Sequence, residues 1–252
     1  MHASFLIHWP KLVPWSRVLL LAGALAMAGR AAADWPTYRH DAARSGYTAE
    51  PLPAGLALAW SFRASSPPQP AWPRSARLTY DRAFQPVIAD GVVCFGGSVD
   101  GQIHALDAAT GTARWSFPTD GPVRFAPAFW NGRFYAVSDD GNLYCLDART
   151  GELRWKKRGA PNDELILGND RMISRWPARG GPVVVAGMVC FSAGIWPSDG
   201  IFLYGLDAAS GQIRWVNDSA DQLYLGQPHP GAYAHSGISP QGYLAASADR
   251  LF

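Results

Sequence analysis

Hydrophobic and polar residues alternate in short runs between residues 86 and 217, and glycines or Asp-Gly pairs separate the runs. Runs with a period of two that are rich in Val, Ile, Phe, Tyr and Cys are typical of half-buried β-strands. The same order of runs occurs three times, and in each copy the last run carries a tryptophan. The pattern therefore predicts three antiparallel units of four strands each, at about residues 86–117, 127–157 and 182–216.

One phrase of eleven residues appears in every unit, as ALDAATGTARW (105–115), CLDARTGELRW (145–155) and GLDAASGQIRW (205–215). In the pattern D-x-x-T/S-G, the Asp and the Thr or Ser side chains can accept backbone N–H bonds, and glycine takes the left-handed conformation. Neighbours on a strand point to opposite faces, so a buried Trp places the preceding Arg outward. The phrase predicts a packing device that uses Asp107, Gly111 and Trp115 in the first copy, Asp147, Gly151 and Trp155 in the second, and Asp207, Gly211 and Trp215 in the third.

A four-stranded sheet of about 40 residues cannot bury both of its faces alone, so such units stack into a β-propeller. The phrase resembles the tryptophan docking motif A-x-D-x-x-T-G-x-x-x-W of the PQQ-like (quinoprotein-type) repeat family, which includes BamB-like exported propeller proteins. The first copy matches every position, and the others depart at Cys145, Gly205 and Ser210. The resemblance implies an all-β propeller with four-stranded antiparallel blades.

Two partial units flank the three complete ones. Residues 56–62 resemble an outer strand without its inner three, and a further unit begins within residues 236–252. Three full blades and two fragments do not close a ring, so we expect an incomplete propeller over residues 56–252, preceded by an N-terminal arm at 34–55. We interpret the chain as the N-terminal fragment of a longer protein.

Residues 1–33 have the pattern of a secretory signal: Lys11 and Arg17, an apolar run at 18–29, and small residues before Asp34. The apolar run is shorter than the roughly 20 residues of a spanning helix. We therefore expect an exported, periplasmic or extracellular protein without a transmembrane span once the signal is removed. Its removal takes away three cations and lowers the net charge from +2 to −1, which indicates no nucleic-acid partner.

The three cysteines are an odd number for an exported protein, and Cys94 and Cys190 occupy the same place in repeats that are not neighbours. Such positions are too far apart for a disulfide. With Cys145, they are predicted to be small buried hydrophobic residues. Neither C-x-x-C nor a His-Cys spacing that would indicate a metal site occurs.

Departures from the repeat indicate where a site could lie. Insertions at 156–181 and 193–200, together with residues 217–235, all emerge on one side of an up-down-up-down blade. A mixed polar and aromatic rim at one mouth of a propeller suits a small ligand or a protein partner, although packing of the loops explains the same residues. The candidate residues of this face are Arg175, Trp176, Arg179, Trp196, His229 and His235.

Two function classes remain open. The first is a non-catalytic exported propeller with a binding or scaffold role through the face that bears the inserted loops. The resemblance also implies an alternative, a quinoprotein dehydrogenase for alcohols or sugars that uses PQQ and Ca²⁺. Such dehydrogenases carry a disulfide between adjacent cysteines, which this chain lacks, and no Ca²⁺ ligand set aligns. We assign no catalytic residue, since hydrolase, P-loop and Rossmann motifs are missing from the sequence.

Overall fold

The computed structural model describes residues 34–52, 54–71, 81–168, 170–219, 223–247 and 249–252. The chain divides into two units, residues 1–33 and residues 34–252. The predicted signal segment lies outside the described residues. Within the described part of the chain, no helix has both the length and the apolar character needed to cross a membrane.

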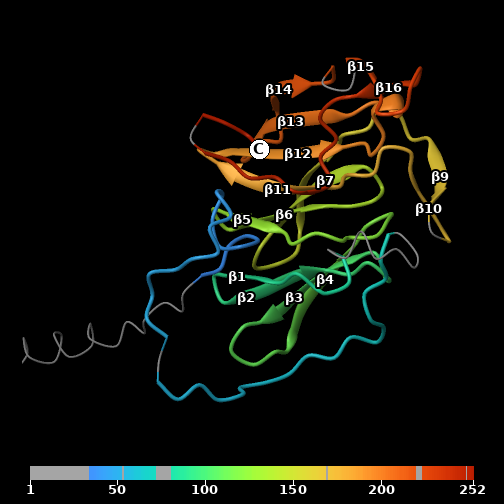
Figure 1. The fold of residues 1–252 in the computed structure, drawn as a ribbon. Helices are drawn as coiled ribbons and strands as arrows, with labels where there is room; N and C mark the ends of the chain where they lie inside the picture. The colour runs from blue at the N-terminus through green and yellow to red at the C-terminus, as the bar shows by residue number, and fades with distance from the viewer. Residues whose placement is uncertain (1–33, 53, 72–80, 169, 220–222, 248) are drawn as a thin grey trace, which may run out of the picture. The chain divides into compact units, whose positions relative to one another are not determined.

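Three antiparallel sheets follow one another along the chain, and each runs in sequence order from an inner to an outer strand (Figure 1). The first contains β1 (Val87–Ala89), β2 (Val92–Gly96), β3 (Gln102–Asp107) and β4 (Ala113–Pro118). The second contains β5 (Ala128–Trp130), β6 (Arg133–Val137), β7 (Asn142–Asp147) and β8 (Leu153–Arg158). The third contains β11 (Gly180–Val185), β12 (Met188–Ala193), β13 (Phe202–Asp207) and β14 (Ile213–Asn217).

The insertions fold into small elements of their own. The first forms a hairpin of β9 (Leu165–Gly168) and β10 (Arg171–Ser174), and the second contains a short 3₁₀ helix, η2 (Pro197–Asp199). A second hairpin, β15 (Leu223–Gly226) with β16 (Tyr233–Ser236), follows the third sheet. The regular elements of the described residues are therefore almost all β-strands, arranged as an incomplete propeller, as the repeat pattern predicts.

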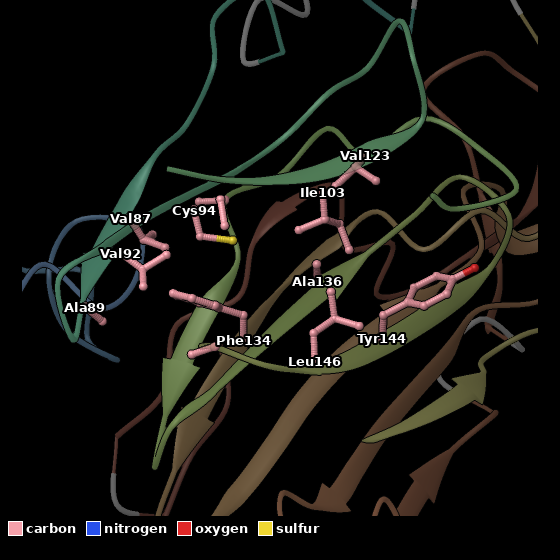
Figure 2. Close-up of a cluster of buried hydrophobic side chains, with 13 residues drawn as sticks. Val87, Ala89, Val92, Cys94, Ile103, Val123, Phe134, Ala136, Tyr144 and Leu146 are labelled. Atoms are coloured by element: carbon pink, nitrogen blue, oxygen red, sulfur yellow. The ribbon is translucent and has the colours of Figure 1, made fainter. Parts of the chain in front are cut away.

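Hydrophobic side chains fill the space between successive sheets. Figure 2 shows Val92 and Cys94 of the first sheet close to Phe134 and Leu146 of the second, in one fully buried cluster. A second cluster joins the second and third sheets through residues such as Tyr135 and Phe191. Each sheet thus buries a face that it could not cover alone.

The last part of the chain adds a short strand to the third sheet. Gly242–Tyr243 forms β17, which pairs in parallel with β11 and extends the third sheet at its inner edge. The Tyr243 ring stacks on Tyr38 of the N-terminal arm at a centroid distance of 3.6 Å. The blade boundaries, including a further blade within 236–252, remain a prediction.

The N-terminal arm crosses the inner strands of all three sheets. Its Trp35 pairs with Ile88 of β1, and the carbonyl of Pro36 accepts a hydrogen bond from the Phe129 amide of β5. Arg44 then donates to the Pro182 carbonyl of β11 at 2.9 Å. The arm is consequently part of the folded unit rather than a loose extension.

All three cysteines are free and buried, which confirms their predicted role as small hydrophobic residues. Burial raises the pKa of the Cys145 and Cys190 thiols to about 11. Their thiolate forms are accordingly scarce near neutral pH.

Candidate functional site

The repeated phrase folds into the same turn in each sheet. The Asp107 carboxylate accepts hydrogen bonds from the backbone amides of Ala109 and Thr110, at 3.0 and 2.9 Å, and from the Thr110 hydroxyl at 3.0 Å. Its second oxygen pairs with Arg114 at 2.6 Å, and this contact, followed by those of Thr110, lowers the pKa of Asp107 to about 2. Gly111 has a φ of 72°, which a residue with a Cβ adopts only with strain.

Each turn receives a tryptophan from the preceding part of the chain. The Trp115 indole of β4 donates to the Ala148 carbonyl of the second sheet at 3.0 Å. Its ring lies only 2.6 Å from where a Cβ on Gly151 would be, so no other residue fits there. The Trp60 indole likewise donates to the Ala108 carbonyl at 3.0 Å, and its ring lies 2.6 Å from where a Cβ on Gly111 would be. Residues 57–62 nevertheless form no regular strand.

The contact between the second and third sheets uses a different hydrogen bond. The Trp155 ring packs on Gly211, but its buried Nε1 has no hydrogen-bond partner among the described residues. The Tyr135 hydroxyl instead donates to the Ala208 carbonyl at 2.8 Å, and Arg133 donates to Ala209 at 2.5 Å. The Tyr135 hydroxyl thus replaces the indole N–H that donates to the corresponding carbonyl in the Trp60 and Trp115 contacts.

Trp215 has no following described sheet to dock on. Its ring packs beside Cys190 and Leu244, and its Nε1 lies 2.2 Å from where a Cβ on Gly205 would be. This close approach explains why the third copy of the phrase begins with glycine.

Arg175 and Trp176 fasten the first insertion to the second. Arg175 forms ion pairs of 2.9 Å with both Glu164 and Asp199, and these two hydrogen-bonded carboxylates, Asp199 first, raise the pKa of its guanidinium. The buried Trp176 indole donates to the Asp199 carbonyl at 2.5 Å. Both side chains therefore make internal polar contacts that stabilise the conformation of the loop face.

Arg179 belongs to a buried ion-pair network that the sequence analysis missed. Its Nε and Nη2 each lie 3.0 Å from the Asp139 carboxylate, which Arg124 also contacts at 2.6 Å. Arg124 reaches Asp81 at 3.2 Å, and all four side chains are almost fully buried. Burial by itself raises the pKa of Asp139, but the charges of Arg179 and Arg124 outweigh it and the pKa lies below its usual value.

No local pattern identifies this network in the sequence, since its members come from loops of different repeats. Arg124 precedes β5, Asp139 follows β6, and Arg179 precedes β11. These loops share the side of the sheets on which the insertions emerge. That shared side is the signal that could have linked Arg124 and Asp139 to the candidate face.

The other three candidate residues are exposed. Trp196 is 50% exposed beside η2, and His229 and His235 lie on the surface of the β15–β16 hairpin. The His235 ring meets Tyr224 edge-on at 5.2 Å, and Tyr224 stacks on Tyr233 at 5.8 Å. Strand β16 contacts η2, which brings the second and third insertions together.

The residues described do not fit a Ca²⁺ ion beside PQQ. Within the described chain no group of three His, Cys, Asp or Glu side chains is close enough to bind a metal. Arg124 and Arg179 could meet carboxylates of a cofactor, but both already pair with the buried Asp139 carboxylate. We therefore derive no reaction step through either group.

The sheet order and the docked tryptophans define an incomplete β-propeller of PQQ-like repeats. A family model described as "Outer membrane protein assembly factor BamB" matches residues 57–221, more than half of the chain, and the chain belongs to this family. No curated protein matches it.

Solved structures support the same fold. A europium-containing methanol dehydrogenase aligns with a TM-score of 0.55 and 18% identity, over 78% of this chain and 34% of its own. The quinohemoprotein alcohol dehydrogenase of Comamonas testosteroni aligns with a TM-score of 0.55 and 25% identity, over 78% of this chain and 29% of its own. Quinohemoprotein alcohol dehydrogenase ADHIIG of Pseudomonas putida HK5 aligns with a TM-score of 0.53 and 23% identity, over 73% of this chain and 26% of its own. The chain thus spans about a third or less of these proteins.

Proposed function

We propose that the protein is exported and acts as a non-catalytic binding or scaffold protein, which recognises a protein partner through the face that bears the inserted loops. The observation that carries this proposal is the β15–β16 hairpin. Leu223 and Leu225 project from one face and are 56% and 50% exposed, while Tyr224 and Tyr233 on the other face are 60% and 62% exposed. An isolated two-stranded hairpin is at best marginally stable in water, so a partner surface would stabilise it.

The composition of this face suits a protein partner. Trp196, Tyr224 and Tyr233 are of the residue types that dominate binding energy in protein interfaces. Arg175 is held by Glu164 and Asp199, so the support beneath the face is already ordered before binding. The family description, an assembly factor for outer membrane proteins, also favours a protein partner.

A quinoprotein dehydrogenase that uses PQQ and Ca²⁺ is the alternative function. It is favoured by the likeness to the Comamonas testosteroni alcohol dehydrogenase, which is 25% identical to this chain. The pairing of Arg124 and Arg179 with Asp139 counts against it within the described residues. Calorimetric titration with PQQ and Ca²⁺ separates the two functions, because saturable binding of both would favour the dehydrogenase.

The binding function can be tested by site-specific crosslinking in cells that export the protein. A photoreactive residue at Tyr224 or Leu225 is expected to give one discrete adduct, whereas the same residue at Val216, which is exposed on β14, gives none. With the partner purified, Trp196→Ala and Tyr233→Ser should each weaken binding about tenfold without lowering the unfolding temperature. Equal adducts at Val216 and Tyr224 would contradict the proposal.

A further inference from the structure

A second feature on the side of the insertions is a cavity of about 540 Å³ between the second sheet and the β9–β10 hairpin. Its volume lies within the range of small-ligand sites. Lys156 and Arg158 of β8 line one part, and Leu165 and Met172 of the hairpin line another. The cavity does not include Trp196 or the β15–β16 hairpin.

The hairpin that covers this cavity is held in place at both ends. Near its turn, Arg171 donates to the Val99 carbonyl at 2.5 Å and to the Gln69 side chain at 3.1 Å. At its base, the Ser174 amide donates to the Asp139 carbonyl at 2.9 Å. These contacts tie the hairpin to loops beside the first and second sheets, so the cavity walls are preformed.

The two cations of the cavity are departures from the repeat. Position 156 is Ser116 in the first copy and Val216 in the third, and position 158 is Pro118 and Asp218. The fold therefore does not require positive charge at either place. Lys156 and Arg158 line the same cavity as the β9–β10 hairpin. The hairpin is an insertion, so it too differs from the other repeats.

Neither cation is neutralised by the protein. Lys156 and Arg158 form no ion pair with any residue in the described part of the chain. The Lys156 ammonium lies 5.4 Å from the centre of the Tyr144 ring, its neighbour across the two strands. This contact orders the Lys156 side chain and leaves its hydrogen-bond donors available.

Three carboxylates face the same cavity in different states. Asp140 accepts hydrogen bonds from the Asn142 amide and the Tyr144 hydroxyl, at 2.9 and 2.5 Å, so it is largely satisfied. The carboxylates of Asp120 and Asp163 accept none from the described residues. The cavity thus presents free groups of both charges.

From this arrangement we propose that the cavity binds a short peptide ligand that carries both a carboxylate and an ammonium group beside an apolar side chain. Lys156 and Arg158 would receive the carboxylate, and Asp120 and Asp163 the ammonium group. Leu165 and Met172, each 55% exposed, would cover the apolar side chain. A ligand with a single charge sign would gain attraction from only one set of these exposed groups, whereas a ligand with both signs gains from both.

The test is calorimetric titration of the intact protein with the dipeptide Ala-Leu, at neutral pH and low ionic strength. We expect saturable binding that weakens as salt is added. N-acetyl-Ala-Leu and Ala-Leu amide, which each lack one charge, should bind about tenfold more weakly. Maltose tests a neutral polyol ligand, and its binding in preference to the dipeptide would overturn the proposal.

Matched variants of β8 locate the binding. Lys156→Ser introduces the residue that the first repeat carries at this position. Lys156→Ser and Arg158→Ser, made as separate variants, should each weaken dipeptide binding about tenfold. Lys157→Ser removes the same charge from the opposite face of the strand and should change binding less than about twofold. Equal losses in all three variants, or no dipeptide binding by the wild-type protein, would overturn the proposal. Crosslinking from Tyr224 stays unchanged in these variants, which separates this site from the proposed partner surface.

Discussion

The contacts between the first and second sheets and between the second and third sheets are built from the same phrase but are held differently. In the first contact, one tryptophan both packs on a glycine and donates the hydrogen bond, through Trp115 and Ala148. In the second, Trp155 packs and Tyr135 donates. The difference shows that ring packing on glycine is the shared requirement, whereas the donor to the carbonyl can be exchanged.

The largest expected effect comes from deleting the docked ring. Trp115→Ala should lower the free energy of unfolding by about 3 kcal/mol, because it removes packing and a hydrogen bond together. Trp155→Ala should cost about 1 kcal/mol less, since Tyr135 still donates to Ala208. Urea denaturation measures both, and equal losses would remove the distinction between the two contacts.

The next effect comes from the glycine beneath the ring. Gly151→Ala places a Cβ 2.6 Å from the Trp115 ring, while Gly132→Ala, at a φ of 72° that is close to the 74° of Gly151, has nothing within 4 Å of the Cβ position. Both variants bear the strain of positive φ, so their difference isolates the ring contact. Gly151→Ala should be less stable than Gly132→Ala by about 1–3 kcal/mol, as measured by the shift in the denaturation midpoint. Equal stability of the two variants would show that the ring moves aside freely.

A smaller effect is expected from the exchanged donor. Tyr135→Phe removes the bond to the Ala208 carbonyl and should cost about 1 kcal/mol. If the Trp155 indole can turn to that carbonyl, the loss will be smaller in the single variant than in the Trp155→Phe background. A double-mutant cycle measures this coupling, and strict additivity would show that the two donors are independent.

The smallest effect concerns acid stability of the docking turns. Arg154 lowers the pKa of Asp147 to about 2, and Arg214 likewise lowers the pKa of Asp207 well below its usual range. A pKa that is lower in the folded state gives stability that is present above about pH 4 and is lost as pH falls toward 2. Thermal unfolding between pH 5 and 2 should show a smaller acid loss in Asp147→Asn and Asp207→Asn than in the wild type. Matching slopes in all three proteins would contradict this assignment.

The candidate site was only partly accessible from the sequence. The insertions predict a rim of polar and aromatic residues on one side of the sheets. In the structure Arg175, Trp176 and Arg179 make internal contacts, while Trp196, His229 and His235 are exposed. Loop positions show which side a residue is on, but whether it pairs inward depends on partners from other loops. The role of the six residues in binding stays a prediction.

The sequence alone determined the strands, the Asp-Gly turns and the repeated Asp, Gly and Trp positions of the phrase, because each of these depends on residues within a few positions of one another or on a repeated period. Only the tertiary structure decided that Tyr135 replaces Trp155 at the Ala208 carbonyl and that Arg124, Asp139 and Arg179 form a buried network. It also decided that Gly242–Tyr243 pairs with β11. These contacts join side chains and strand edges from different repeats, and the distance between such groups is set by how the sheets stack.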